Sequence, residues 1–402
     1  MKKIVFGLII FLTFINVYAL DINSKNAVLY NLNDDNVIYE KSKDEKIQIA
    51  SLTKIMTSIV AIENIDNIND YVTLKQSDFK GLEGYAKAGF NVGDKVTYED
   101  LLYGIILPSG ADAVQAIANN VSGSIDDFVE LMNKKAVELN LKNTHFDNPI
   151  GMDSVENYSS VDDVAKTLKY ALKNKDFKKI FTTKKYTTTN GLVLSSTISA
   201  KAKVLNKDAS YILGSKTGTT NKAGLCLASI ASLSNIDYLL VTCGAKNGSY
   251  PYNLEDALDT YNYYDENYEY KTLISKNQLL KTLKVKKSTI KKLDIYSNKN
   301  IKVYVKKNID LNNLEYKYDG LDVIDYKSKV GDKLGVITVM YEGEELYTYD
   351  VVLNTEIKKF PYYLIYISIF VFFMLIIYIK NKKKKRRIKR TRKTSLQTNL
   401  II

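Results

Sequence analysis

The sequence predicts a mixed α/β protein of the α+β kind, followed by a small all-β unit and one transmembrane helix. Apolar residues recur at helical spacing through much of residues 51–173, and two apolar strands joined by a short turn follow at 225–245. From about residue 270 the pattern changes to short alternating strands separated by turn residues. The twenty residues 360–379 carry no charge, which is long enough to cross a membrane.

Composition excludes several kinds of site. Two cysteines in 402 residues exclude a disulfide scaffold and a cysteine-rich zinc site. A single histidine, His145, leaves no histidine cluster, so we expect no metal and no cofactor. The net charge of +12 is concentrated at the ends: eleven Lys and Arg residues and no acid lie within 380–393. Because this positive charge flanks apolar runs, we expect no nucleic-acid partner.

The N-terminus is typical of an exported protein. Lys2 and Lys3 precede an apolar run over 4–15, and Ala19 offers a small residue for cleavage. Residues 1–19 are therefore predicted to be a secretory signal peptide, with an uncleaved anchor as the alternative.

The C-terminus is typical of a membrane anchor. Residues 360–379 are predicted to be a single transmembrane helix, and the basic block follows immediately. Because Lys and Arg favour the cytoplasmic side, we expect residues 380–402 to be a cytoplasmic tail and 20–359 to lie outside the cell membrane. The signal peptide requires the same orientation.

The exported part opens with a predicted hairpin, because an Asn/Asp turn separates β-rich runs at 26–30 and 37–40. Further helices are expected at 124–141, 160–173 and 253–264, where apolar residues follow helical spacing.

Ser51 opens the first apolar helical pattern, and Lys54 follows three residues later. Residues at i and i+3 are neighbours on a helix, so the hydroxyl and the amine can meet. A serine hydroxyl needs an adjacent base to become a nucleophile, and lysine is such a base only if its pKa falls. The same spacing recurs at Ser77/Lys80 and Ser288/Lys291, so any single copy can instead be a solvated helix face.

Two later stretches also combine glycine with reactive side chains. Pro108-Ser109-Gly110 interrupts the apolar helical segments 101–107 and 111–121, which places a hydroxyl at a helix end; the alternative is that Ser109 is an N-cap. Lys216-Thr217-Gly218 lies in a β-rich stretch, where glycine lets a strand approach a ligand closely. Lys216 could meet a carboxylate, whereas the alternative is an ordinary surface strand.

Cys226 and Cys243 are expected to lie opposite each other in the hairpin at 225–245. A disulfide outside the cell is one hypothesis. We favour two buried free thiols, because directly opposed strand residues strain a disulfide.

Three elements therefore occur in order: Ser51-x-x-Lys54, Ser109-Gly110-Ala111 and Lys216-Thr217-Gly218. This set resembles the serine D-alanyl-D-alanine carboxypeptidases, the low-molecular-mass penicillin-binding proteins. The resemblance covers roughly residues 23–265, and more loosely the β unit to about 355. Matching segments outside the three elements lie at 92–97, 99–104, 143–152 and 221–224.

The resemblance implies an architecture. Residues 20–268 are expected to form a β-lactamase/transpeptidase-like catalytic domain, with an antiparallel sheet flanked by helices. Residues 269–356 are expected to form the small all-β domain, which has no chemistry of its own and acts as a stalk or spacer.

The resemblance also implies roles for residues. Ser51 would be the acylated nucleophile, Lys54 its base and Ser109 a proton shuttle toward the leaving D-alanine. The substrate would be bound by Lys216, Thr217, Gly218 and Thr219. Of these, Lys216 and Thr217 would hold its terminal carboxylate. The backbone N–H groups of Ser51 and Thr219 would form an oxyanion hole, and Lys216 would be a second cation that lowers the pKa of Lys54.

The implied substrates are peptidoglycan stem peptides ending in D-Ala-D-Ala, with β-lactams as covalent inhibitors and the membrane as a further partner. One residue departs from the family pattern: Ala111 stands where an asparagine is usual. Losing a hydrogen bond to a charged group costs roughly 1.5–3 kcal/mol. The adjacent Asp112 is expected to point elsewhere on the helix. A slow or non-catalytic scaffold of the same fold is therefore the alternative, and a β-lactamase is a weaker one.

Overall fold

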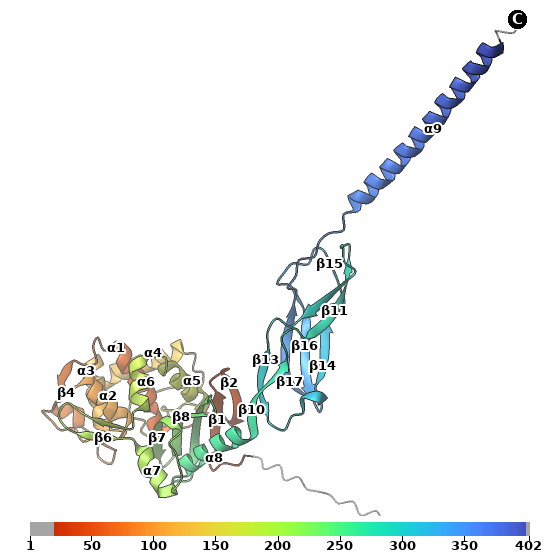
Figure 1. The fold of residues 1–402 in the computed structure, drawn as a ribbon. Helices are drawn as coiled ribbons and strands as arrows, with labels where there is room; N and C mark the ends of the chain where they lie inside the picture. Colours follow the sequence, from red (N-terminus) through yellow and green to blue (C-terminus); the bar gives the residue numbers. More distant parts are fainter. Residues whose placement is uncertain (1–19, 399–402) are drawn as a thin grey trace, which may run out of the picture. The chain divides into compact units, whose positions relative to one another are not determined.

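The structure is a computed structural model that describes residues 20–398, and the predicted signal peptide at 1–19 lies outside the described residues. The chain divides into two units, Met1–Glu266 and Asn267–Ile402 (Figure 1). The first unit combines helices with a five-stranded sheet, and the second contains strands and one short 3₁₀ helix before a long C-terminal helix.

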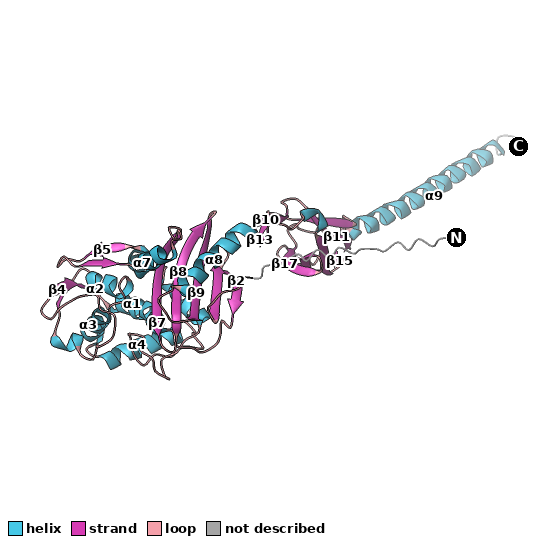
Figure 2. Cartoon of the chain, turned by 90° about the horizontal axis from the view of Figure 1, so that it is seen from below, coloured by secondary structure: helices cyan, strands magenta, loops and turns pink. Residues whose placement is uncertain are grey.

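The sheet of the first unit is antiparallel, in the order β2-β1-β9-β8-β7 (Figure 2). Its strands are β1 (Asn26–Asn31), β2 (Asn36–Lys41), β7 (Ile212–Thr220), β8 (Gly224–Leu233) and β9 (Ile236–Ala245). The predicted N-terminal hairpin is confirmed as β1 and β2. Because β1 pairs with β9, the start of the described chain is joined to strands that lie about two hundred residues later.

Helices cover both faces of this sheet. On one face Tyr30 of β1 donates a hydrogen bond to Asp162 of α5 (Val161–Ala171). On the other face Tyr261 of α8 (Tyr252–Asn267) donates to the carbonyl of Ser229 in β8. Successive strand residues point to opposite faces. Accordingly, all six residues of β1 are buried.

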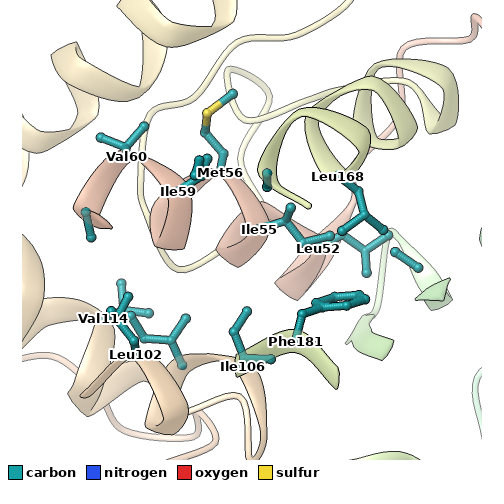
Figure 3. Close-up of a cluster of buried hydrophobic side chains, with 14 of the residues drawn as sticks. Leu52, Ile55, Met56, Ile59, Val60, Leu102, Ile106, Val114, Leu168 and Phe181 are labelled. Carbon is teal, nitrogen blue, oxygen red and sulfur yellow. The ribbon is translucent and has the colours of Figure 1, made fainter. Parts of the chain in front are cut away.

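The helix α1 (Thr53–Asn64) is the centre of the helical part, and ten of its residues are buried. Figure 3 shows part of the apolar cluster around α1, which combines side chains of α1, Leu52 just before it and side chains from four other helices. These helices are α2 (Tyr98–Ile106), α3 (Ala111–Ser122), α5 and α6 (Lys175–Thr182). The remaining helices and strands of this unit are α4 (Ile125–Glu138), α7 (Thr197–Leu205), and the short pairs β3 (Tyr71–Thr73) with β4 (Lys95–Thr97) and β5 (Lys185–Thr187) with β6 (Val193–Ser195). Two 3₁₀ helices, η1 (Ala50–Leu52) and η2 (Gln76–Phe79), complete it.

The two cysteines are both buried and free, as favoured from the sequence. A register shift between Leu225 and Leu227 interrupts the β8–β9 ladder at Cys226. Cys226 and Cys243 are therefore not a regular ladder pair, but they are cross-strand neighbours, as predicted. The thiols still interact, and burial together with Cys226 raises the pKa of Cys243.

The second unit is all-β up to its C-terminal helix, as predicted. Its strands form three small sheets around a separate apolar core. They are β10 (Tyr268–Ile274), β11 (Leu279–Lys286), β12 (Lys292–Tyr296), β13 (Ile301–Lys306), β14 (Glu315–Gly320), β15 (Val323–Asp325), β16 (Lys333–Tyr341) and β17 (Glu344–Val352). The alternating pattern predicts strands at 278–285, 301–305, 334–341 and 345–353, which correspond to β11, β13, β16 and β17; the other four strands were not predicted.

The C-terminal helix α9 spans Tyr362–Thr398, and its part Tyr362–Arg392 is long and apolar enough to cross a membrane. The predicted span began at 360, but the helix begins after Pro361, because proline lacks the N–H needed inside a helix. The helix also continues through the basic block instead of ending at 379.

Candidate active site

Residues from all three sequence elements line one cleft of about 600 Å³ in the first unit, although Lys216 itself is buried and does not line it. Ser51 and Lys54 come from the start of α1, Ser109 and Ala111 from the turn before α3, and Thr217, Gly218 and Thr219 from β7. Neither Ser77, which is exposed, nor Ser288, which belongs to the second unit, lines it. The first of the three Ser-x-x-Lys copies is thus the one that meets the other motifs.

Ser51 and Lys54 are in hydrogen-bond contact. Ser51 lies in the 3₁₀ turn Ala50–Leu52 that leads into α1, and Lys54 Nζ is 3.0 Å from Ser51 Oγ. Lys54 is 1% exposed, and its Nζ also donates to the carbonyl of Ile150 at 2.7 Å. A backbone carbonyl accepts a hydrogen bond but is too weak a base to take a proton from serine. The Ile150 carbonyl therefore orients the Lys54 amine toward Ser51 and leaves the amine as the base.

Both lysines of the site have lowered pKa values. Burial lowers the pKa of Lys54 to about 7, against the opposing effect of the Asp112 carboxylate. Burial and the charge of Lys54 lower the pKa of Lys216 well below its usual value. The expected fall for Lys54 therefore occurs, but its cause is burial and not the second cation. The repulsion between the ammonium groups lowers the pKa of Lys216 instead.

Ser109 occupies a strained backbone position. Its φ of 69° is left-handed, a conformation that few residues other than glycine adopt. Gly110 is the N-cap residue of α3 and Ser109 is not, so the alternative reading of Ser109 as a helix cap is wrong. Such strain persists only where surrounding contacts enforce it, and it concentrates at functional sites.

The contacts that enforce this turn come from residues 86–90 and from Asp112. The carboxylate of Asp112 accepts backbone hydrogen bonds from Ala88, Gly89 and Phe90 at 2.7, 3.0 and 3.2 Å. The N–H of Ala111 donates to the carbonyl of Ala86 at 2.8 Å. Asp112 therefore points away from the cleft, as predicted.

Gly110 is required by this packing. A Cβ there would lie 2.5 Å from Asp112 Oδ1 and 2.7 Å from Ala88 N, so a side chain would force the segments apart. The hydrogen bonds between Asp112 and residues 88–90 were not predicted, because no local sequence pattern links positions more than twenty residues apart.

The strand β7 forms the wall opposite Ser109. Lys216 is 1% exposed, so the alternative reading of this stretch as an ordinary surface strand is wrong. A Cβ on Gly218 would lie 3.0 Å from Ser51 N, which shows how closely β7 approaches the nucleophile turn. The backbone of β7 therefore passes directly beside the backbone of Ser51.

Several cleft residues were not identified from the sequence. Thr197 at the start of α7 shares a hydrogen bond of 2.8 Å with Thr217, Oγ1 to Oγ1. Glu83, Tyr85 and Asp153 also line the cleft; they lie on loops without a recognisable motif, so only the fold brings them there. Asn221 lines the cleft as well, and it belongs to the matching segment 221–224 noted from the sequence.

His145 and metal ligands play no part in this cleft. His145 Nδ1 lies 2.6 Å from the carbonyl of Glu156, and the residue is absent from the cleft lining. Among residues 20–398 no group of three His, Cys, Asp or Glu side chains is arranged to hold a metal ion.

Several known proteins are similar to this chain. Residues 14–247 match the family described as D-alanyl-D-alanine carboxypeptidase, and residues 268–359 match the family described as penicillin-binding protein 5, C-terminal domain. The chain is 31% identical over 348 residues to D-alanyl-D-alanine carboxypeptidase DacF of Bacillus subtilis (strain 168), covering 84% of this chain and 86% of the relative. It is 32% identical over 265 residues to D-alanyl-D-alanine carboxypeptidase DacC of Escherichia coli (strain K12), covering 61% and 63%.

A solved structure extends the likeness over both units. Penicillin binding protein 5 from Haemophilus influenzae aligns with a TM-score of 0.66 at 23% identity, covering 85% of this chain and all of that one. At this identity the likeness supports the fold alone.

Proposed function

Because the chain belongs to the D-alanyl-D-alanine carboxypeptidase family, a family of serine hydrolases, we propose that it removes the terminal D-alanine from peptidoglycan stem peptides through an acyl-enzyme on Ser51. The observation that carries this proposal is the 3.0 Å contact between Lys54 Nζ and Ser51 Oγ, inside the cleft lined by the other motifs.

Acylation starts with proton transfer from Ser51 to Lys54. With a pKa near 7, much of Lys54 is a neutral amine at neutral pH and can take this proton as Oγ attacks the carbonyl carbon of the penultimate D-alanine. The backbone N–H groups of Ser51 and Thr219 stabilise the negative charge on the carbonyl oxygen. As the C–N bond breaks, Ser109 passes a proton from the lysine to the leaving amine of D-alanine.

The terminal carboxylate of the peptide binds at Lys216 and Thr217. An ammonium group is the natural partner of a carboxylate, and the Thr217 hydroxyl adds a hydrogen bond. Thr197 supports this assignment, because its hydroxyl contacts that of Thr217 and fixes its position. Binding of an anion beside Lys216 also offsets the repulsion between the two lysines.

Deacylation returns the enzyme to its starting state. Water attacks the ester of Ser51, the serine oxygen regains its proton, and the shortened peptide leaves with a new carboxylate. A β-lactam acylates Ser51 by the same route, but its leaving nitrogen stays tethered by the opened ring. This is the physical basis for the covalent inhibition that we propose.

Ala111 supports a second candidate function. It lines the cleft where its methyl group cannot supply the hydrogen bonds of an amide. A cost of about 1.5–3 kcal/mol would slow such an enzyme by roughly one to two orders of magnitude. The alternative is therefore a scaffold of this fold that binds peptidoglycan or penicillin but turns over very slowly.

Labelling with a fluorescent penicillin tests the proposal. We expect a covalent adduct on the wild-type chain and none on Ser51→Ala, because the acyl bond needs the Ser51 hydroxyl. Ser77→Ala is the matched control, since Ser77 is exposed and belongs to another Ser-x-x-Lys copy; it should label like wild type. A wild-type chain without an adduct contradicts the acyl-enzyme.

We further propose that the catalytic domain, residues 20–268, and the β domain, residues 269–356, lie outside the cell membrane. The apolar helix Tyr362–Arg392 would anchor them, with the tail 380–402 in the cytoplasm. The β domain would then act as a spacer between the membrane and the catalytic cleft.

A further inference from the structure

A second polar cavity, of about 570 Å³, adjoins the catalytic cleft. We call it the lysine groove, after Lys25, Lys222 and Lys246, which line it. Asn221 lines both the groove and the cleft, so the two cavities are neighbours at the turn between β7 and β8. Neither the sequence motifs nor the proposed mechanism uses the groove.

The groove carries uncompensated positive charge. All three of its lysines are exposed, and none of them forms an ion pair with a side chain in the described part of the chain. Its one acid, Glu45, already accepts a hydrogen bond of 2.7 Å from Asn26 Nδ2. Clustered cations in a concave site attract anions and raise their local concentration.

The groove is also held in shape next to the cleft. Asn247 Nδ2 donates to the carbonyl of Thr220 at 2.9 Å, which joins the groove to the end of β7. The backbone N–H of Lys222 donates to Asp153, a residue that lines the cleft, at 3.3 Å. Lys25 packs its aliphatic stem against Gly244, where a Cβ would lie 3.0 Å from Lys25 Cβ.

The direction of the bound peptide points to this groove. This inference rests on the proposed function, in which the terminal carboxylate lies at Lys216 and Thr217 and the scissile carbonyl lies at Thr219. The upstream residues of the peptide then continue past Thr220 toward Asn221. An extended chain advances about 3.3 Å per residue, so the second or third residue upstream of the scissile bond reaches the groove.

We propose that the lysine groove binds a carboxylate carried by the stem peptide upstream of its D-Ala-D-Ala end. Lys222 and Lys246 pair with this carboxylate, while the amide side chains of Asn221 and Asn247 can hydrogen-bond the peptide groups beside it. The groove therefore gives the enzyme a preference for peptides that are acidic upstream of the cleavage site.

Two synthetic pentapeptides test this preference. They end in D-Ala-D-Ala and differ only in an upstream carboxylate, which is free in one and converted to an amide in the other. With the full-length protein in detergent, we expect kcat/KM to be roughly tenfold higher for the free acid, because two partly exposed ion pairs are lost with the amide. Added salt should reduce this ratio.

The double variant Lys222→Gln/Lys246→Gln should show the same kcat/KM for both peptides, and this value should equal the kcat/KM of the wild type for the amide peptide. Lys142→Gln removes an exposed lysine that lines neither cavity and should keep the tenfold preference. Equal wild-type kcat/KM values for the two peptides, or a preference that survives the double substitution, would overturn the groove proposal while leaving the proposed function intact. A wild-type enzyme that cleaves neither peptide overturns both.

Discussion

Lys54→Met is expected to lower the rate at which β-lactams acylate Ser51 by about a thousandfold. The substitution removes the amine that lies 3.0 Å from Ser51 Oγ, while methionine fills a similar volume in a site that is 1% exposed. Without the base, the hydroxyl must lose its proton to water. The acylation rate of wild type and variant, followed by a chromogenic β-lactam, measures the loss.

The pH dependence of the same reaction separates a base from a merely structural lysine. Since the neutral amine accepts the proton, the wild-type rate should rise tenfold per pH unit below about 7 and level off above it. In Lys54→Met this rise of the acylation rate with pH (the acidic limb of the pH profile) should disappear. The control Lys80→Met alters the exposed Ser-x-x-Lys copy and should keep both rate and limb. A Lys54→Met enzyme that acylates at the wild-type rate contradicts the role of Lys54.

Lys216→Met is expected to lower kcat/KM for a D-Ala-D-Ala peptide by roughly 10- to 150-fold, since a charge-assisted hydrogen bond contributes about 1.5–3 kcal/mol. The proposal assigns this lysine to the terminal carboxylate, in a buried position beside the cleft. Steady-state hydrolysis of the peptide measures the effect.

A peptide whose terminal carboxylate is an amide makes this test specific. Wild type should discriminate strongly against the amide, whereas Lys216→Met should process acid and amide almost equally. Lys203→Met, an exposed lysine on α7, serves as control. If Lys216→Met still prefers the free acid by the wild-type ratio, the carboxylate binds elsewhere.

Local patterns predicted much of this fold and site. The helices around Ser51 follow apolar spacing, and the β1–β2 hairpin follows its Asn/Asp turn, because both signals lie within a few residues. The ordered motifs predicted which side chains share the cleft, since each motif is short and rigidly placed by an adjacent helix or strand.

What the sequence did not predict depends on contacts between distant segments. The bonds from Asp112 to residues 88–90 and the contact of Thr197 with Thr217 arise only after folding. The left-handed Ser109 is likewise imposed by neighbouring segments, because serine alone disfavours that conformation. Burial of Lys54, which sets its pKa, is a property of the whole domain.

The central claim is that Ser51 attacks the D-Ala-D-Ala bond with Lys54 as base. Mass spectrometry of a D-Ala-D-Ala pentapeptide after incubation with the full-length protein tests it most directly, with Ser51→Ala as the comparison. The account predicts a tetrapeptide and one free D-alanine from wild type, and an unchanged pentapeptide from Ser51→Ala. An unchanged pentapeptide with wild type, or a tetrapeptide released by Ser51→Ala, would contradict it.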